Sequence, residues 1–133
     1  MRFLWGREPG SRGGIVSLGT FDGVHQGHIA LLRASQAWAR ELHTYVEIWV
    51  YHPHPRTILR QEEVPLITTL EERSFLLEEY GVEVLRVIQF SRDLSLVPAE
   101  AFVQEWLVRS ADPRGVVLGY DLSLIHISEP TRP

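Results

Sequence analysis

The chain has 133 residues, a length that fits one domain. Hydrophobic residues make up 44% of it, which is enough for a packed core and excludes an intrinsically disordered chain. The formal net charge of −4 argues against a nucleic-acid-binding protein, because such a protein needs a basic surface.

Two residue types are missing altogether. The chain has no cysteine, which excludes a disulfide framework, a thiolate metal site and a thiol nucleophile. All 13 basic residues are arginine, which excludes a Schiff-base lysine and the lysine of a P-loop. The first residues lack the apolar run of a signal peptide, and no stretch is long enough to span a membrane. We therefore expect a cytoplasmic protein that does not contact a membrane.

Strand and helix patterns alternate in the first half of the chain. Residues 14–19 form a short apolar run that predicts a buried strand. A helix is expected over residues 25–42. The spacing of three and four residues puts the following side chains on one face of it: His28, Leu32, Ser35, Ala39 and Leu42. Residues 45–51 are β-branched and aromatic and predict a second strand, which the Pro-His-Pro turn at residues 53–55 must end.

The same alternation continues in the second half. Thr69 and Glu72 form a capping box that predicts a helix over residues 70–80, and Gly81 is a candidate to end it. Residues 82–90 predict a third strand. A further helix begins near Pro98, with an apolar face of Phe102, Val103, Trp106 and Leu107. Residues 115–119 predict a fourth strand. This order indicates an α/β fold with a mostly parallel sheet and helices on both faces.

The last twelve residues, 122–133, do not continue this pattern. They resemble an in-frame translation of a sequencing-library adapter, and an isolated Ile-His-Ile followed by two prolines has nothing to pair with. We expect residues 1–121 to be a domain that is incomplete at its C-terminus and residues 122–133 to be a non-native tail. The alternative is a genuine C-terminal strand and tail.

The segment from Gly19 to His28 carries the strongest functional pattern. It leaves a buried strand and begins a helix, which is where α/β sheets bind ligands. A helix N-terminus offers free N–H groups and the positive end of a dipole, so it suits phosphate. His25 and His28 are three residues apart and should project to one side of the first turn. Gly27 between them has no Cβ and lets a phosphate approach the backbone.

Two histidines over a phosphate fit phosphoryl or nucleotidyl transfer. They can donate hydrogen bonds to oxygens that gain charge in the transition state. Helix capping and metal binding are the alternatives for such a pair.

The stretch Gly-Thr-Phe-Asp-Gly-Val-His-Gln-Gly-His at residues 19–28 resembles a known signature. Its His-x-Gly-His end is similar to the motif of the nucleotidylyltransferase superfamily, and its full length resembles the signature of bacterial bifunctional riboflavin kinase/FAD synthetase. The Pro-His-Pro turn, the element Glu-Ala-Phe-Val at residues 100–103 and the stretch Val-Val-Leu-Gly-Tyr-Asp at residues 116–121 extend the resemblance over residues 13–121. The chain departs from the family at His52, where the family has an acidic residue, and at Leu122, where a phenylalanine should follow Asp121.

The resemblance implies a Rossmann-like FMN adenylyltransferase domain that makes FAD and pyrophosphate from ATP and FMN. It implies that His25 and His28 are catalytic, that Mg²⁺ accompanies ATP, and that no residue here is a dedicated metal ligand. It implies a longer flavin-metabolising transferase that also phosphorylates riboflavin, so this chain alone is expected to be inactive. The nucleotide-binding residues that the resemblance implies are Gly19, Phe21, Asp22, Gly27, His54 and Asp121.

Two other functions stay open. One is a nucleotidylyltransferase that uses a pantetheine, nicotinate or glycerol phosphate as acceptor. The other is a nucleotide-binding fragment without catalysis. ATP and FMN are the expected partners, and the sequence does not define an oligomeric state.

Overall fold

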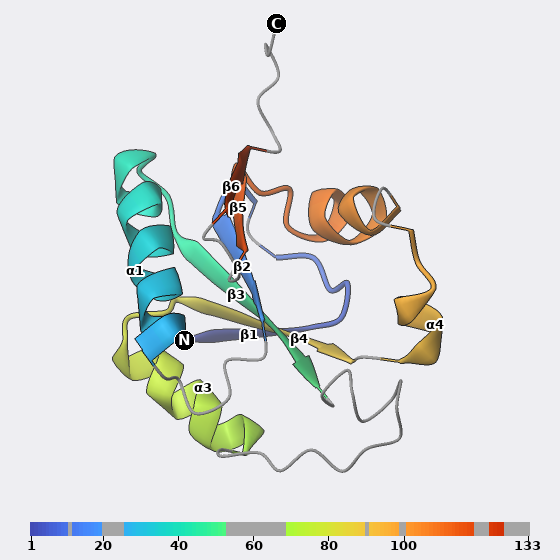
Figure 1. The fold of residues 1–133 in the computed structure, drawn as a ribbon, viewed down its shortest axis with the longest axis horizontal. Coiled ribbons are helices and arrows are strands. Elements are labelled where there is room, and N and C mark those ends of the chain that lie inside the picture. Colours follow the sequence, from blue (N-terminus) through green and yellow to red (C-terminus); the bar gives the residue numbers. More distant parts are fainter. Residues whose placement is uncertain are drawn as a thin grey trace, which may run out of the picture.

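The computed structural model describes residues 1–10, 12–19, 26–52, 69–89, 91–98, 101–118 and 123–126 (Figure 1). The strands are β1 (Arg2–Trp5), β2 (Ile15–Gly19), β3 (Val46–His52), β4 (Val84–Gln89), β5 (Gly115–Leu118) and β6 (Ser123–His126). The helices are α1 (Gln26–Glu41), α3 (Leu70–Glu79), the short α4 (Arg92–Ser95) and a π-helix, η2 (Phe102–Val108).

The six strands form one sheet in the order β1-β4-β3-β2-β5-β6. The pairings among β1 to β5 are all parallel, and only β6 is antiparallel, against β5. The predicted α/β fold with a mostly parallel sheet is therefore confirmed. Its central strand is β2, which pairs with β3 on one side and β5 on the other.

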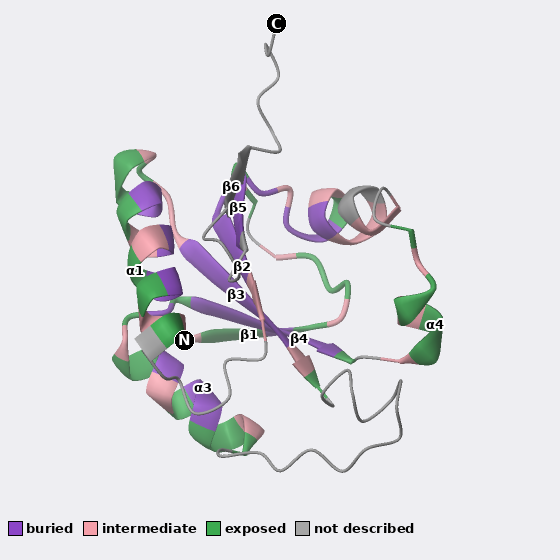
Figure 2. Cartoon of the chain, in the orientation of Figure 1, coloured by how far each residue is buried: buried purple, intermediate pink, exposed green. Residues whose placement is uncertain are grey.

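Each face of the sheet is covered by its own core (Figures 1 and 2). On the first face, Ile15, Ile48 and Leu85 of the strands pack with Leu32 of α1 and Leu77 of α3. On the second face, the strands pack against η2, and the buried members are Val16, Trp49, Ile88, Leu107, Ala111 and Val116. Helices on both faces were predicted from the alternation of elements, and this arrangement confirms it.

The helix boundaries follow the predicted signals. Thr69 Oγ1 accepts a hydrogen bond from the Glu72 N–H at 3.0 Å, and Glu72 Oε1 accepts one from the Thr69 N–H at 2.9 Å, so the capping box is complete. Gly81 follows α3 with φ at +88°, a conformation that favours glycine at a helix end. In α1, Leu32, Ser35 and Ala39 are buried along the predicted face.

A buried ion pair anchors the second face. Arg86 Nε donates to Glu47 Oε2 at 2.7 Å, and both side chains are almost fully buried. The indole N–H of Trp49 donates to the same carboxylate oxygen. The Arg86 guanidinium also donates to the carbonyl oxygens of Gly6 and Glu8, so it holds the segment after β1 against the sheet.

Three elements were not predicted: β1, α4 and β6. β1 has only four residues. Phe3, Leu4 and Trp5 are all apolar although only Leu4 is buried, so the sequence shows no alternation of apolar and polar residues that would predict a strand. η2 begins where a helix was expected, and the Phe102 N–H bonds to the Pro98 carbonyl at 2.9 Å, but its turns are those of a π-helix. β6 lies in the segment that was expected to have nothing to pair with, and this expectation is wrong, because β6 pairs antiparallel with β5. The pairing does not test whether the segment is native.

Candidate nucleotide site

The carboxyl ends of the parallel strands meet at one edge of the sheet. β2 ends at Gly19, β3 at His52, β4 at Gln89 and β5 at Leu118. The chain moves from β2 outward through β3 to β4 and then crosses back to β5 on the other side of β2. In such a sheet, the crevice outside the carboxyl ends at this switch in strand order is where ligands bind.

The beginning of α1 lies at this edge. Gln26 is the first residue of α1, so Gly27 and His28 belong to its first turn. Six residues of chain separate Gln26 from Gly19 at the end of β2. Gly27 is exposed and the His28 side chain is partly buried. This turn combines an imidazole with the N–H groups of a helix N-terminus, which can bind an anion such as phosphate.

The body of α1 is fixed to β2. The hydroxyls of Ser17 on β2 and Ser35 on α1 form a buried hydrogen bond, and Ser35 Oγ also donates to the Leu31 carbonyl at 2.8 Å. Two small hydroxylated residues allow the helix to lie close to the strand. The position of the first turn relative to the sheet edge is therefore held by contacts within the core.

The structure places three of the predicted site residues, Gly19, Gly27 and His28, at the carboxyl edge. The other predicted site residues lie outside the described residues: His25, Phe21, Asp22, His54 and Asp121. Along the chain, residues 20–25 follow β2, residues 53–68 follow β3 and residues 119–122 follow β5.

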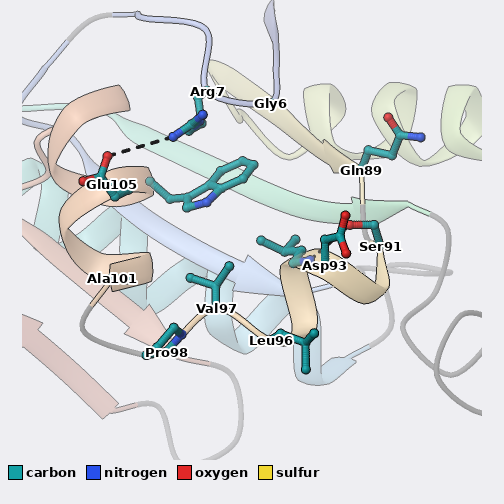
Figure 3. A pocket seen from close by; sticks show the side chains of 12 residues that line it. Gly6, Arg7, Gln89, Ser91, Asp93, Leu96, Val97, Pro98, Ala101 and Glu105 are labelled. Atoms are coloured by element: carbon teal, nitrogen blue, oxygen red, sulfur yellow. Dashed lines mark hydrogen bonds and ion pairs between the residues drawn. The ribbon is translucent and has the colours of Figure 1, made fainter.

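A cavity of about 720 Å³ opens near the end of β4, on the face covered by η2 (Figure 3). Trp106 contributes its ring to the cavity, and the Arg7 guanidinium carbon lies 5.5 Å from the centre of that ring. Arg7 is also 4.0 Å from the Glu105 carboxylate. Gln89 and Ser91 line the side nearest the carboxyl edge. The sequence predicted only packing for Trp106, because the segment after β1 that completes this cavity has no readable pattern.

Tyr51 is partly buried near the end of β3, and this burial raises the pKa of its phenol. The Tyr51 hydroxyl therefore stays protonated at neutral pH.

Within the described ranges, no group of three or more His, Cys, Asp or Glu side chains could hold a metal ion. None of the helices in the described part of the chain has the length and apolarity that a membrane crossing requires.

A family model described as FAD synthetase matches residues 8–129. The chain belongs to the FAD synthetase family. Curated relatives include the bifunctional riboflavin kinase/FMN adenylyltransferases of Bacillus subtilis, 30% identical over 82% of this chain, and of Escherichia coli, also 30% identical over 82%. The chain spans about a third of the length of these two relatives, 35% in each case. A protein of Geobacillus thermodenitrificans with the same name, marked putative, is 32% identical, and the chain covers 59% of it.

A solved structure has the same fold as this chain. The protein, described as a macrolide-efflux protein from Streptococcus pneumoniae, matches 91% of this chain with a TM-score of 0.79 and 24% identity, and 43% of that protein is covered. At this identity the likeness shows the fold alone. The resemblance of residues 19–28 to FAD synthetase is therefore confirmed at the level of the family and of the α/β fold.

Proposed function

We propose that the carboxyl edge of β2 and β5 is the nucleotide site of an FMN adenylyltransferase, which converts ATP and FMN into FAD and pyrophosphate. The observation that carries this proposal is the position of Gly27 and His28 in the first turn of α1, beside the switch in strand order. A helix N-terminus at that place suits the phosphates of a nucleotide. The names of the curated relatives support this reaction.

In the proposed reaction, an oxygen of the FMN phosphate attacks the α-phosphorus of ATP. A new P–O bond forms, and the bond to the β-phosphate breaks with its electron pair leaving on pyrophosphate. His25 and His28 donate hydrogen bonds to the phosphate oxygens on which charge grows, and His54 contacts the triphosphate. The attacking phosphate is already an anion, so no covalent intermediate on the protein is needed. The remaining proposed nucleotide contacts are Gly19, Phe21, Asp22, Gly27 and Asp121.

Mg²⁺ would arrive with ATP and neutralise its phosphates. We assign it no protein ligand. The chain spans about a third of its relatives, and we propose that it is part of a longer cytoplasmic protein whose remainder phosphorylates riboflavin. In that protein, residues 1–121 would be native and residues 122–133 would be replaced by the rest of the domain. The 133-residue chain by itself should be inactive.

The test uses this longer protein, expressed from the gene once its sequence beyond codon 121 has been determined. His28→Ala should lower the rate of FAD formation by about 10²–10³-fold, the loss expected when a donor to a charged transition state is removed. Riboflavin phosphorylation should stay within about twofold. Replacing FMN by pantetheine, nicotinate or glycerol phosphate should give no transfer of AMP.

The matched control is His43→Asn, because His43 is exposed beyond the opposite end of α1. His43 has φ at +56°, and asparagine tolerates this conformation. FAD formation should be unchanged in this variant. Normal FAD formation by His28→Ala, or AMP transfer to another acceptor in preference to FMN, would refute the proposed function.

A further inference from the structure

Most of the exposed large hydrophobic side chains in the described part of the chain gather beside one edge of the sheet. The described residues include four such side chains: Phe3 (48%), Trp5 (59%), Phe75 (61%) and Leu96 (76%). Phe3 and Trp5 belong to β1, the outermost strand beside β4. Leu96 follows α4 and lies away from this edge, beside the η2 cavity.

The strand register shows which face these two rings occupy. Phe3 pairs with Leu85 and Trp5 with Val87 of β4, and parallel partners point to the same face. Leu85 and Val87 belong to the core beneath α1 and α3. Phe3 and Trp5 therefore project on the side of the sheet that α3 covers.

Phe75 lies on the same side. The amino group of Met1, just before β1, is 2.8 Å from Glu78 Oε2, so the Glu78 face of α3 borders β1. Phe75 precedes Glu78 by three residues, and residues three apart share a helix face. The opposite face of α3 is anchored in the core by Leu77, which is fully buried. Phe3, Trp5 and Phe75 are therefore all exposed on the side of the sheet that α3 covers.

Within α3, the exposed charges around Phe75 have one sign. Four exposed glutamates occupy the positions three and four residues before and after it, namely Glu71, Glu72, Glu78 and Glu79. The one basic residue of α3, Arg73, is buried. Glu72 is used by the capping box and Glu78 by the Met1 amine, but neither Glu71 nor Glu79 has an ion-pair partner among the described residues. A cavity of about 400 Å³ adjoins Phe75, and its described lining is Glu71, Glu72, Phe75 and Leu76.

This charge selects the kind of partner. A phosphate backbone or an anionic lipid surface would be repelled by four carboxylates. A second copy of the chain would bring one acidic helix against another across a two-fold axis. A polypeptide segment with apolar side chains on one face and Lys or Arg beside them would cover the rings and neutralise the glutamates.

We propose that Phe3, Trp5 and Phe75 with Glu71, Glu72, Glu78 and Glu79 form an aromatic–acidic surface that docks a basic amphipathic polypeptide helix. The rings accept its apolar face, and the cavity beside Phe75 accepts a basic side chain, which can lie on the ring while it pairs with Glu71. This surface lies on α3 and β1 and does not depend on the proposed nucleotide site.

A fluorescein-labelled 18-residue helical peptide of leucine and lysine serves as the probe, and its anisotropy is measured with the 133-residue chain. Phe75→Ser should weaken binding by about tenfold or more, the loss expected for a buried aromatic anchor. Glu79→Gln should weaken it about threefold at low salt, and this difference should vanish at high salt. A peptide with glutamate in place of lysine should not bind measurably.

Two matched variants separate this surface from general attraction. Leu96→Ser removes an exposed hydrophobic side chain elsewhere, and Glu41→Gln removes the exposed glutamate that ends α1, as Glu79 ends α3. Both should bind the peptide like the parent chain, and circular dichroism should show all four variants folded. Equal affinity for Phe75→Ser and the parent, or equal losses in the two control variants, would overturn the proposal.

Discussion

At the scale of single residues, the packing on the second face of the sheet includes an ion pair between Glu47 and Arg86 that is shielded from water. Glu47 and Arg86 are almost fully buried, and the Arg86 guanidinium carbon lies 5.1 Å from the centre of the Trp49 ring. An arginine in such a place needs its carboxylate partner, because a buried charge left unpaired is strongly unfavourable. Nothing in the sequence marked this pair, since Glu47 and Arg86 are 39 residues apart and each reads as an ordinary charge on a strand.

Glu47→Gln keeps the shape of the side chain and removes its charge. We expect the free energy of unfolding to fall by about 3–5 kcal/mol, because Arg86 then lacks a counter-charge in the core. The double variant Glu47→Leu with Arg86→Met should lose less than Glu47→Gln alone, since it removes both charges. Urea denaturation followed by circular dichroism measures both values. A loss below about 1 kcal/mol for Glu47→Gln would mean that the pair does not hold this face together.

At the scale of elements, local signals predicted the boundaries of α3 well. The reciprocal hydrogen bonds between Thr69 and Glu72 need only four consecutive residues, so they can be recognised without knowledge of the fold. β1 could not be recognised in this way, because it pairs with β4, which lies about 80 residues along the chain. The π-helical turns of η2 likewise follow from packing on the second face and carry no sequence signal of their own.

Thr69→Ala removes the hydroxyl that accepts the Glu72 N–H. The free energy of unfolding should fall by about 1 kcal/mol, the usual cost of losing a helix N-cap. Thr69→Ser retains a hydroxyl and should change stability by only a few tenths of a kcal/mol. Chemical denaturation of the three proteins in parallel makes the comparison. If the alanine and serine variants were equally stable, the capping box would not contribute.

At the scale of the whole molecule, the alternation of strand and helix patterns in the sequence predicted the α/β fold. The candidate site could be predicted only in part. The four strands at the centre of the sheet and the two longer helices that pack on it were predicted because each buries an apolar face. Ile15, Ile48 and Leu85 are examples from the strands. The strand order could not be predicted, because parallel strands pair across long connections. The signature at residues 19–28 predicted the family, which the match over residues 8–129 confirms.

The structure places Gly19, Gly27 and His28 at the carboxyl edge, and the roles of all the predicted site residues stay predictions. Sequence reasoning did not find the η2 cavity beside Trp106, because three separate segments build it. It also did not find the aromatic–acidic surface, because that surface needs β1 to lie beside α3. Both features depend on contacts between residues far apart in the chain.

The central claim is that the first turn of α1 binds the phosphates of ATP. Its most direct test is a titration of the longer protein, labelled with ¹⁵N in its histidine side chains, with Mg²⁺-ATP while the imidazole nitrogen resonances are recorded. The account predicts that the signals of His25 and His28 shift in a saturable way and that the signal of His43, beyond the other end of α1, stays in place. A His28 signal that does not respond to ATP, or a shift of the same size at His43, would contradict it.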